Sequence, residues 1–373
     1  MAAPSAVEAG SRCLVRRLCD GSRRYAQGVT DADVAPESQP ELSTVGSRSA
    51  VIHHGPRVHR RDDLAPDSPY ELDGIAFRTL SEPGEHLATF ATVNDVHFGE
   101  EVAGLVSGTD VGPVFRAEPG DPPYPEVMNR GAVDEIAALA PDALIVKGDL
   151  TSNGTDAEVD AFLAAYAPLA DRMTWVRGNH ESFHHQERGA VPTQEVVLDG
   201  VRLAVLDTSV DGAELGFVSD EQLEWLDDVA ASSDRPVVVL GHHHVWDPGS
   251  DVRPERYFGV DPDASERLVD LVARRPRIVA YLACHTHRNR VRRFGPTGDL
   301  PWVEVACVKD YPGSWAEYRV HEGGILQFVH RISSPEALAW TEKTRHMYHG
   351  LYADYALGSL ADRCFVIPAD RAA

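Results

Sequence analysis

Residues 87–97, LATFATVNDVH, join an apolar run to an aspartate and a histidine that stand one residue apart. The run has the length and composition of a buried β-strand, and Asp95 and His97 follow at its end. Side chains at positions i and i+2 of an extended chain lie on the same side, so this carboxylate and imidazole can share one ion. The same arrangement, an apolar run followed by a short polar fragment, occurs four more times along the chain.

The four later fragments also stand at the ends of apolar runs. They are residues 148–149 (GD) after ALIVK, 178–181 (GNHE) after TWVR, 241–244 (GHHH) after VVVL, and 284–287 (CHTH) after IVAYLA. Functional groups that leave the carboxyl ends of neighbouring strands converge on one crevice in an α/β fold. We therefore expect all five fragments to meet at one site.

The residue types in these fragments match the ligand chemistry of a two-metal hydrolytic site. Asp149 is either a helix N-cap or a carboxylate that bridges two cations, since an unpaired buried charge is very costly. Asn179 offers a neutral carbonyl oxygen, while His285 and His287 form a pair typical of metal chelates. Each fragment alone is also compatible with an ordinary polar turn or surface loop, so the prediction depends on their shared placement.

Other histidines are expected to have different roles. His180 follows Asn179 directly, so its side chain points elsewhere and is free to donate a proton to a substrate, with Glu181 as the carboxylate that orients it. Successive side chains diverge, so the histidines at 242–244 cannot all bind one site. His184 and His185 follow no strand and are expected to lie in a solvated loop.

Strands alternate with helices along most of the chain, which predicts an α/β layered fold, with either a mixed sheet or a β-sandwich flanked by helices. Helices are expected around residues 124–140, 155–167, 264–274 and 335–347 and after the capping Ser219, and a hairpin is expected across Asp199-Gly200. Residues 1–48 show no period and are expected to form a mobile tail. Residues 49–332 form the main domain with an N-terminal strand extension, and residues 333–373 form a C-terminal extension.

The composition of the chain disfavours several kinds of binding partner. The 373 residues carry a formal charge of −23, which disfavours duplex nucleic acid and anionic membranes as partners, whereas a small phosphorylated substrate is compatible if bound cations supply positive charge. No apolar run approaches the length of a membrane span, the first twenty residues lack the apolar core of a secretory signal, and the five cysteines contain no C-x-x-C pair. We expect a cytoplasmic protein, and the sequence assigns no oligomeric state.

The ordered series D-x-H, G-D, G-N-H-E, G-H and H-x-H, from Asp95 to His287, resembles the calcineurin-like binuclear metallophosphoesterase superfamily. The resemblance implies a four-layer α/β/β/α sandwich and two divalent metals (Fe, Mn or Zn) that activate a water for attack on phosphorus. It implies that Asp95, His97, Asp149 and His287 hold one metal. It implies that Asp149, Asn179, His242 and His285 hold the other, with His180 as the catalytic imidazole near the leaving group.

Three departures from the family pattern qualify this assignment. Cys284 stands where the last motif usually has glycine, and the triple histidine leaves His242 and His243 as alternative ligands. Ser152 stands where the purple acid phosphatase branch has a tyrosine ligand. The chain looks most like the bacterial cyclic-nucleotide phosphodiesterase-like branch.

The resemblance predicts hydrolysis of a small phosphodiester such as a cyclic nucleotide. The alternatives are a phosphomonoesterase or nucleotidase and, from another class, a non-catalytic metal-binding scaffold for a partner protein. Specificity is expected from the polar loops at residues 99–123, 184–192, 247–260 and 309–311.

Overall fold

The strand that ends just before Asp95 lies inside a six-stranded sheet. In this computed structural model, which describes residues 39–106, 110–255 and 257–370, the strand is β6 (His86–Val93) and the sheet order is β17-β16-β15-β6-β7-β8. Strands β6, β7 and β8 run parallel, whereas the other pairings in this sheet are antiparallel. The remaining strands are β7 (Ala143–Lys147), β8 (Met173–Val176), β15 (Ser314–His321), β16 (Gly324–Arg331) and β17 (Cys364–Pro368).

A second six-stranded sheet has the order β13-β14-β12-β11-β10-β9. Strands β10, β11, β12 and β14 are parallel, and the predicted hairpin across Asp199-Gly200 is confirmed as the antiparallel pair β9 and β10. The strands of this sheet are β9 (Thr193–Leu198), β10 (Val201–Leu206), β11 (Val237–Leu240), β12 (Ile278–Ala283), β13 (Arg290–Arg292) and β14 (Trp302–Glu304).

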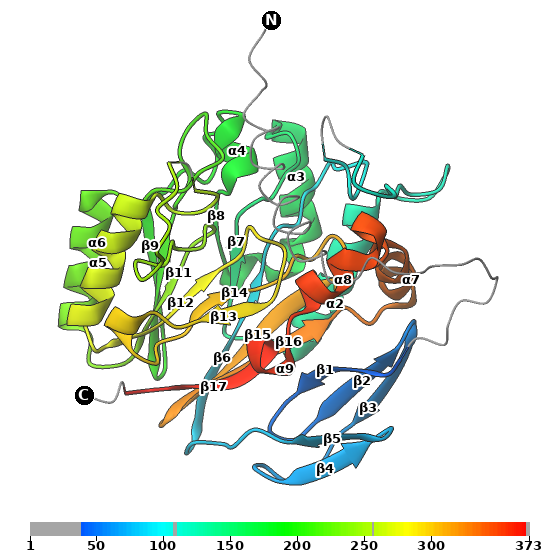
Figure 1. Cartoon of the computed structure of the whole chain (residues 1–373), viewed down its shortest axis with the longest axis horizontal. Helices are drawn as coiled ribbons and strands as arrows, with labels where there is room; N and C mark the ends of the chain where they lie inside the picture. Colours follow the sequence, from blue (N-terminus) through cyan, green and yellow to red (C-terminus); the bar gives the residue numbers. More distant parts are fainter. Residues whose placement is uncertain (1–38, 107–109, 256, 371–373) are drawn as a thin grey trace, which may run out of the picture.

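The two sheets pack face to face, and helices cover both outer faces (Figure 1). Alternation along β7 explains the layering: Ala143 and Ile145 face the other sheet, whereas Leu144 and Val146 face the helices. One outer layer contains α5 (Asp220–Ser232) and α6 (Pro262–Arg274). The other contains α2 (Tyr124–Leu139), α3 (Asp156–Ala165), α7 (Pro335–Thr344) and α8 (Leu351–Leu357). The predicted four-layer α/β/β/α sandwich is confirmed.

Local sequence signals explain where the helices begin. The Ser219 hydroxyl accepts from the backbone N–H of Gln222, and the Gln222 side chain accepts from the N–H of Ser219, which completes the predicted capping box of α5. Thr155 and Glu158 cap α3 in the same way. Two further α-helices are short: α4 (Asn179–Phe183) and α9 (Leu360–Arg363). Among the residues that the structure describes, no helix combines the length and apolar character needed to cross a bilayer.

The N-terminal part of the described chain forms two small sheets. Strands β1 (Glu41–Val45), β2 (Ala50–His54) and β3 (Arg57–Arg61) form one, and β4 (Pro69–Leu72) pairs with β5 (Ile75–Arg78) in the other. The expectation that residues up to 48 lack a strand is wrong for residues 41–45, because pairing with β2 and burial of Val45 order this segment. Residues 1–38 of the expected tail lie outside the described residues.

The C-terminal segment completes the first sheet, which the sequence did not predict. Strand β17 pairs with β16, so the chain returns to the sandwich after α8 and α9. The predicted helix at 335–347 is present as α7 and ends at Thr344.

A buried ionic cluster attaches β1 to the sandwich. The Arg331 side chain is 2% exposed, and its guanidinium donates to Glu41 Oε1 at 2.7 Å. The Tyr311 hydroxyl and Arg345 Nη2 donate to Glu41 Oε2 at 2.6 and 3.1 Å. Removal of the shared carboxylate would leave two cations close together with less compensation.

We expect Glu41→Ala to lower the free energy of unfolding by about 3 kcal/mol, because it leaves the buried Arg331 charge without its main partner. Urea denaturation followed by circular dichroism measures the change. The matched control is Glu118→Ala, whose ion pair with Lys343 is exposed, and it should cost less than about 1 kcal/mol. Equal losses in the two variants would contradict a structural role for the cluster.

Candidate metal centre and active site

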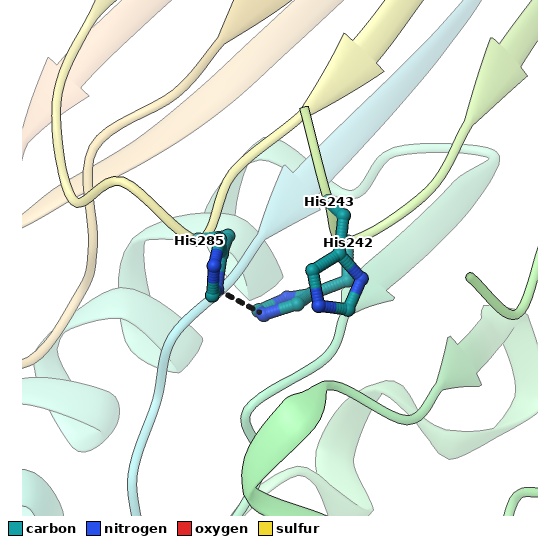
Figure 2. A group of neighbouring side chains, drawn as sticks. All are labelled: His242, His243 and His285. Carbon is teal, nitrogen blue, oxygen red and sulfur yellow. Dashed lines mark hydrogen bonds between the residues drawn. The ribbon is translucent and has the colours of Figure 1, made fainter. Parts of the chain in front are cut away.

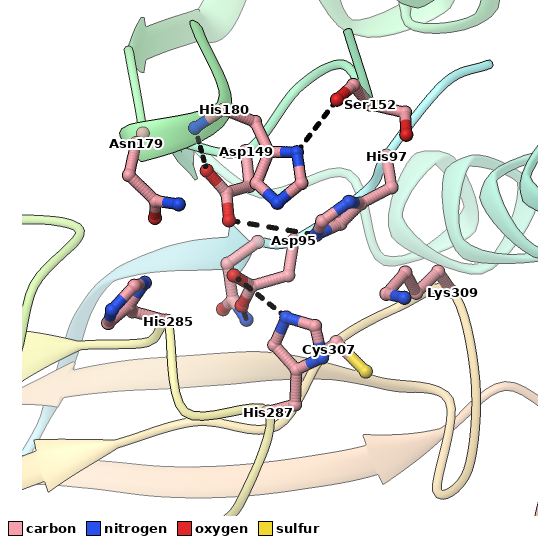
Figure 3. Close-up of polar contacts among 12 residues, drawn as sticks. Asp95, His97, Asp149, Ser152, Asn179, His180, His285, His287, Cys307 and Lys309 are labelled. Atoms are coloured by element: carbon pink, nitrogen blue, oxygen red, sulfur yellow. Dashed lines mark hydrogen bonds and ion pairs between the residues drawn. The ribbon is translucent and has the colours of Figure 1, made fainter. Parts of the chain in front are cut away.

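All five polar fragments meet at one end of the sandwich, as the sequence predicted. Asp95 and His97 follow β6, Asp149 follows β7, and Asn179 and His180 begin α4 after β8. From the second sheet, the histidine run at 242–244 follows β11, and His285 and His287 follow β12. Figure 3 shows Asp95, His97, Asn179, His180, His285 and His287 gathered around Asp149. They are buried or half-buried.

The loops are held together through the main chain of Gly148 and Asp149. The Asp149 carbonyl oxygen accepts from the N–H groups of Val96 and His97 at 2.9 and 3.0 Å, and the Gly148 carbonyl accepts from Asp95 N–H at 3.1 Å. Five of the site residues adopt left-handed backbone angles, which non-glycine residues rarely do. They are Asp95 (φ 50°), His97 (49°), Asp149 (48°), His285 (69°) and His287 (53°). Such conformations cluster at functional sites, where the surrounding structure holds them.

Two glycines make this close approach sterically feasible. A Cβ on Gly178 would lie 2.2 Å from Asp149 Oδ1, and a Cβ on Gly148 would lie 2.7 Å from both Arg177 O and His242 Nδ1. Gly148 also has a φ of 85°, which glycine adopts without strain. The glycines of the GD and GN fragments are therefore packing requirements of the site.

The candidate ligand atoms lie close to the separations expected for ligands that share a cation. Ligands bonded at about 2.1 Å to one ion stand about 3.0–3.4 Å apart when they are adjacent in its coordination sphere. His97 Nε2 and His242 Nε2 lie 3.6 and 3.4 Å from Asp149 Oδ2, and His287 Nε2 lies 3.5 Å from Asp95 Oδ1. The ligand atoms of Asp95, His97, Asp149 and His287 all lie within 4.8 Å of one another.

His242 and His243 occupy different environments (Figure 2). His242 Nδ1 donates to the Lys147 carbonyl at 2.8 Å, which leaves its Nε2 facing Asn179 Oδ1 at 3.0 Å and His285 Nδ1 at 3.1 Å. His243 Nδ1 instead lies 2.9 Å from the Thr208 hydroxyl. The three imidazoles of His242, His243 and His285 form a second group with ligand atoms within 4.8 Å of one another.

The buried groups of the site shift one another's pKa values: burial lowers the pKa of His242, but Asp149 and Cys284 raise it well above its usual range. Burial alone would raise the pKa of Asp149, but His242 and His180 hold this pKa well below its usual range, so the carboxylate is charged. Burial lowers the pKa of His97 and of His285, which keeps these imidazoles neutral, the form that binds metals. Asp95 Oδ1 and His97 Nε2 are buried and have no hydrogen-bond partner among the described residues. This donor set fits divalent metals.

His180 lies beside the carboxylate with a different set of contacts. Its backbone N–H donates to Asp149 Oδ1 at 3.0 Å, and its Nδ1–H donates to the Ser152 carbonyl at 2.8 Å. The expected pairing with Glu181 is wrong. Glu181 instead accepts from Thr151 at 2.6 Å and from Gly178 N–H at 2.8 Å, because its side chain folds back to cap α4 and the adjacent loop.

Two buried charges that the sequence analysis missed support the ligand loops. Lys147 is buried between the sheets, and its Nζ donates to the Ala283 carbonyl at 2.7 Å, which joins β7 to β12 directly beneath the site. Glu304 accepts from the Thr286 hydroxyl at 2.8 Å and from Arg288 at 3.0 Å, and so fixes the loop that carries His285 and His287. A lysine at the end of the apolar run ALIVK and a glutamate inside WVEV were the available signals.

Cys284, which replaces the glycine of the family pattern, fits this loop without distortion. Its side chain is buried, and its S–H donates to the Lys147 carbonyl at 3.0 Å, next to His242 Nδ1 at 3.3 Å. The thiol therefore packs behind the imidazole ring of His242 and leaves Nε2 of that ring uncovered on the opposite side.

A cavity of about 250 Å³ opens directly onto these residues. Asp149, His180, His285 and His287 line it, and so does His184, whereas His185 pairs with Asp211 at the surface. All four loops expected to give specificity contribute to the lining of the cavity, through Glu100, His184, Phe258, and Lys309 with Asp310. Arg253 does not line it, because it pairs with Asp263 and Glu266 outside, and Arg256 lies outside the described residues.

Comparison with known proteins agrees with this geometry. The family model described as calcineurin-like phosphoesterase matches residues 88–289, which is more than half of the chain. The chain belongs to this family. The matched segment contains all five polar fragments. Strands β1–β5 and the C-terminal segment lie outside it.

Named relatives of this calcineurin-like chain come from bacteria. It is 30% identical over 192 residues to the 3′,5′-cyclic adenosine monophosphate phosphodiesterase CpdA of Pseudomonas aeruginosa, covering 49% of this chain and 68% of the relative. It is 34% identical over 166 residues to a probable cyclic nucleotide phosphodiesterase of Rhodococcus erythropolis, covering 41% of this chain and 54% of the relative. The match thus spans only about half of the second relative.

A solved structure supports the fold. A dimetal phosphatase from Danio rerio superposes with a TM-score of 0.51 at 15% identity, covering 66% of this chain and 96% of that chain. The sequence-based resemblance to the calcineurin-like superfamily and to its cyclic-nucleotide phosphodiesterase-like branch is confirmed.

We expect Gly178→Ala to disrupt the ligand cluster, because the new Cβ would collide with the Asp149 carboxylate and main chain. The expected result is a loss of bound metal, measured by elemental analysis after reconstitution with manganese. Gly295→Ala is the control, since a Cβ at Gly295 meets no atom within 4 Å. Metal content equal to that of the control would contradict the packing argument.

Proposed function

We propose that this protein is a metal-dependent phosphodiesterase that hydrolyses a small phosphodiester, such as a cyclic nucleotide. The observation that carries the proposal is the position of His180 beside a buried carboxylate that is ringed by imidazoles. This arrangement places a proton donor next to a group of cation ligands, at the mouth of a cavity large enough for a small substrate.

The site would hold two divalent cations, Fe, Mn or Zn, with Asp149 as the bridge between them. One cation would bind Asp95, His97, Asp149 and His287, and the other would bind Asp149, Asn179, His242 and His285. The distances to Asp149 Oδ2 from His97 on one side and His242 on the other support this division. His242 is preferred to His243 as the ligand because its Nε2 faces both Asn179 and His285.

When bound, divalent cations supply Lewis acidity toward a phosphoryl oxygen and lower the pKa of a coordinated water. The chain's own contribution is the placement of the proton donor. Because Nδ1–H of His180 is held by the Ser152 carbonyl, the ring orientation is fixed and Nε2 is the nitrogen left for the substrate. As water attacks phosphorus and the bond to the leaving oxygen breaks, the protonated Nε2 donates its proton to that oxygen.

The names of the relatives favour a diester over a monoester as substrate. Besides the two cyclic nucleotide phosphodiesterases, the chain is 26% identical over 188 residues to the glycerophosphodiester phosphodiesterase GpdQ of Enterobacter lignolyticus. A cation pair would also bring positive charge to a chain of formal charge −23, which otherwise repels phosphorylated substrates.

We expect Asp149→Ala to lose both bound metal and activity, because it removes the bridging carboxylate. His180→Ala should keep its metal and lose turnover by about 10²–10⁴-fold, the usual contribution of a general acid. Elemental analysis and hydrolysis of bis(p-nitrophenyl) phosphate measure the two effects. His185→Ala, which removes an exposed histidine paired with Asp211, is the control and should retain both.

A His180→Ala variant with full activity would remove the proposed role of this residue. Faster hydrolysis of p-nitrophenyl phosphate than of the diester would favour a phosphomonoesterase or nucleotidase. Inactivity of the manganese-loaded protein toward both substrates would favour the scaffold alternative.

A further inference from the structure

One side of the cavity is built by residues that lie outside the segment matched by the family. Lys309, Asp310, Met347, Tyr348 and Tyr352 line this side, whereas the matched segment ends at residue 289. None of these residues belongs to the ligand fragments. This side of the cavity is called the distal wall below.

Tyr348 reaches the cavity through an unusual turn between α7 and α8. Tyr348 and the following His349 both have left-handed backbone angles, with φ of 51° and 56°. Two successive non-glycine residues in this conformation store strain, which persists only where the surroundings hold it. The loop around Gly112 does so, because a Cβ on Gly112 would lie 2.9 Å from His349 N and 3.0 Å from Tyr348 Cα.

Two aromatic rings of the distal wall contact each other. Tyr352 contacts Tyr348 edge to face, with ring centres 5.6 Å apart and planes at 79°. Tyr352 is itself fixed, since its hydroxyl donates to Asp310 Oδ1 at 2.8 Å. Tyr348 is half-buried and lines the cavity on which His180 and His287 also open.

The polar floor of the distal wall is an ordered cluster of charges. Lys309 Nζ lies 2.6 Å from Glu100 Oε2 and 3.4 Å from Asp310 Oδ2, and Asp310 also accepts from the Cys307 thiol at 2.9 Å. One ammonium between two carboxylates leaves this floor with a net negative charge. It offers acceptors to N–H and O–H groups and repels a second phosphate.

We propose that the distal wall is a subsite for a nucleobase, with the base stacked on Tyr348 and its N–H groups directed to the Glu100 carboxylate. This inference rests on the proposed phosphodiesterase function and specifies the organic group of the substrate. An aromatic face binds every base through its π-surface, and a planar ligand loses little entropy on binding. An aliphatic alcohol such as glycerol has no such face to stack.

The test compares Tyr348→Gly and Tyr348→Phe on two substrates, 3′,5′-cyclic AMP and glycero-3-phosphoethanolamine, with the manganese-loaded full chain. Glycine removes the ring but suits the left-handed angle, so Tyr348→Gly should retain the native fold, which circular dichroism checks. It should raise KM for cyclic AMP by about 5- to 150-fold, the usual effect of losing one base-stacking ring. The kcat for cyclic AMP and both constants for glycero-3-phosphoethanolamine should change little, and Tyr348→Phe should behave like the unaltered protein.

Direct binding provides a second readout. Adenosine, which has the base without a phosphate, should bind the unaltered protein in isothermal titration calorimetry and should not bind Tyr348→Gly. Leu351→Ala removes an exposed side chain from the same segment and is the control. An unchanged KM for cyclic AMP in Tyr348→Gly, or an equal rise for both substrates, would overturn the subsite while leaving the proposed hydrolysis intact. Inactivity of the unaltered protein toward both substrates would instead contradict the proposed function.

Discussion

The buried carboxylate of Asp149 is the constraint to which the rest of the site responds. A charged carboxylate in the interior is stable only when it is paired, and three imidazoles and one backbone N–H surround this one. The same residue organises the main chain, since its carbonyl oxygen binds the loop of His97. The charge balance of the site and the geometry of its loops therefore both depend on Asp149. A side chain at Gly178 would collide with Asp149, and one at Gly148 would collide with Arg177 and His242.

The carboxylate can hold ligands from both sheets only because the two sheets are joined beneath it. The carbonyl of Lys147 accepts from His242 Nδ1 and from the Cys284 thiol, while the Lys147 ammonium reaches the Ala283 carbonyl. Main-chain and side-chain bonds of one residue of β7 thus fix the ends of β11 and β12. This coupling keeps the His242 and His285 rings in register with the loops of the first sheet, and it supports the left-handed angles found there.

The sequence predicted the features that depend on local pattern. The hydrophobic period and the capping residues located the helices and the hairpin, and the polar fragments after apolar runs located the candidate ligand residues. It did not predict features that depend on distant partners. Strand β1 forms through pairing with β2 and contact with Arg331, β17 pairs with β16, and Glu181 turns toward Thr151 rather than His180. Tyr348 was visible only as part of an aromatic-rich tail, because nothing local indicates that a tail returns to a cavity.

The way the C-terminal segment is attached explains how it can shape the cavity without disturbing the ligands. It binds the last ligand loop through main-chain carbonyl groups: the Tyr355 hydroxyl donates to Thr286 O, and Asn289 N–H donates to Ala356 O at 2.9 Å. Contacts of this kind fix the position of the segment whatever its other side chains are. The residues that face the cavity, such as Tyr348, are therefore free to differ while the ligand geometry is preserved. The candidate metal centre and the distal wall are therefore built by separate segments of the chain.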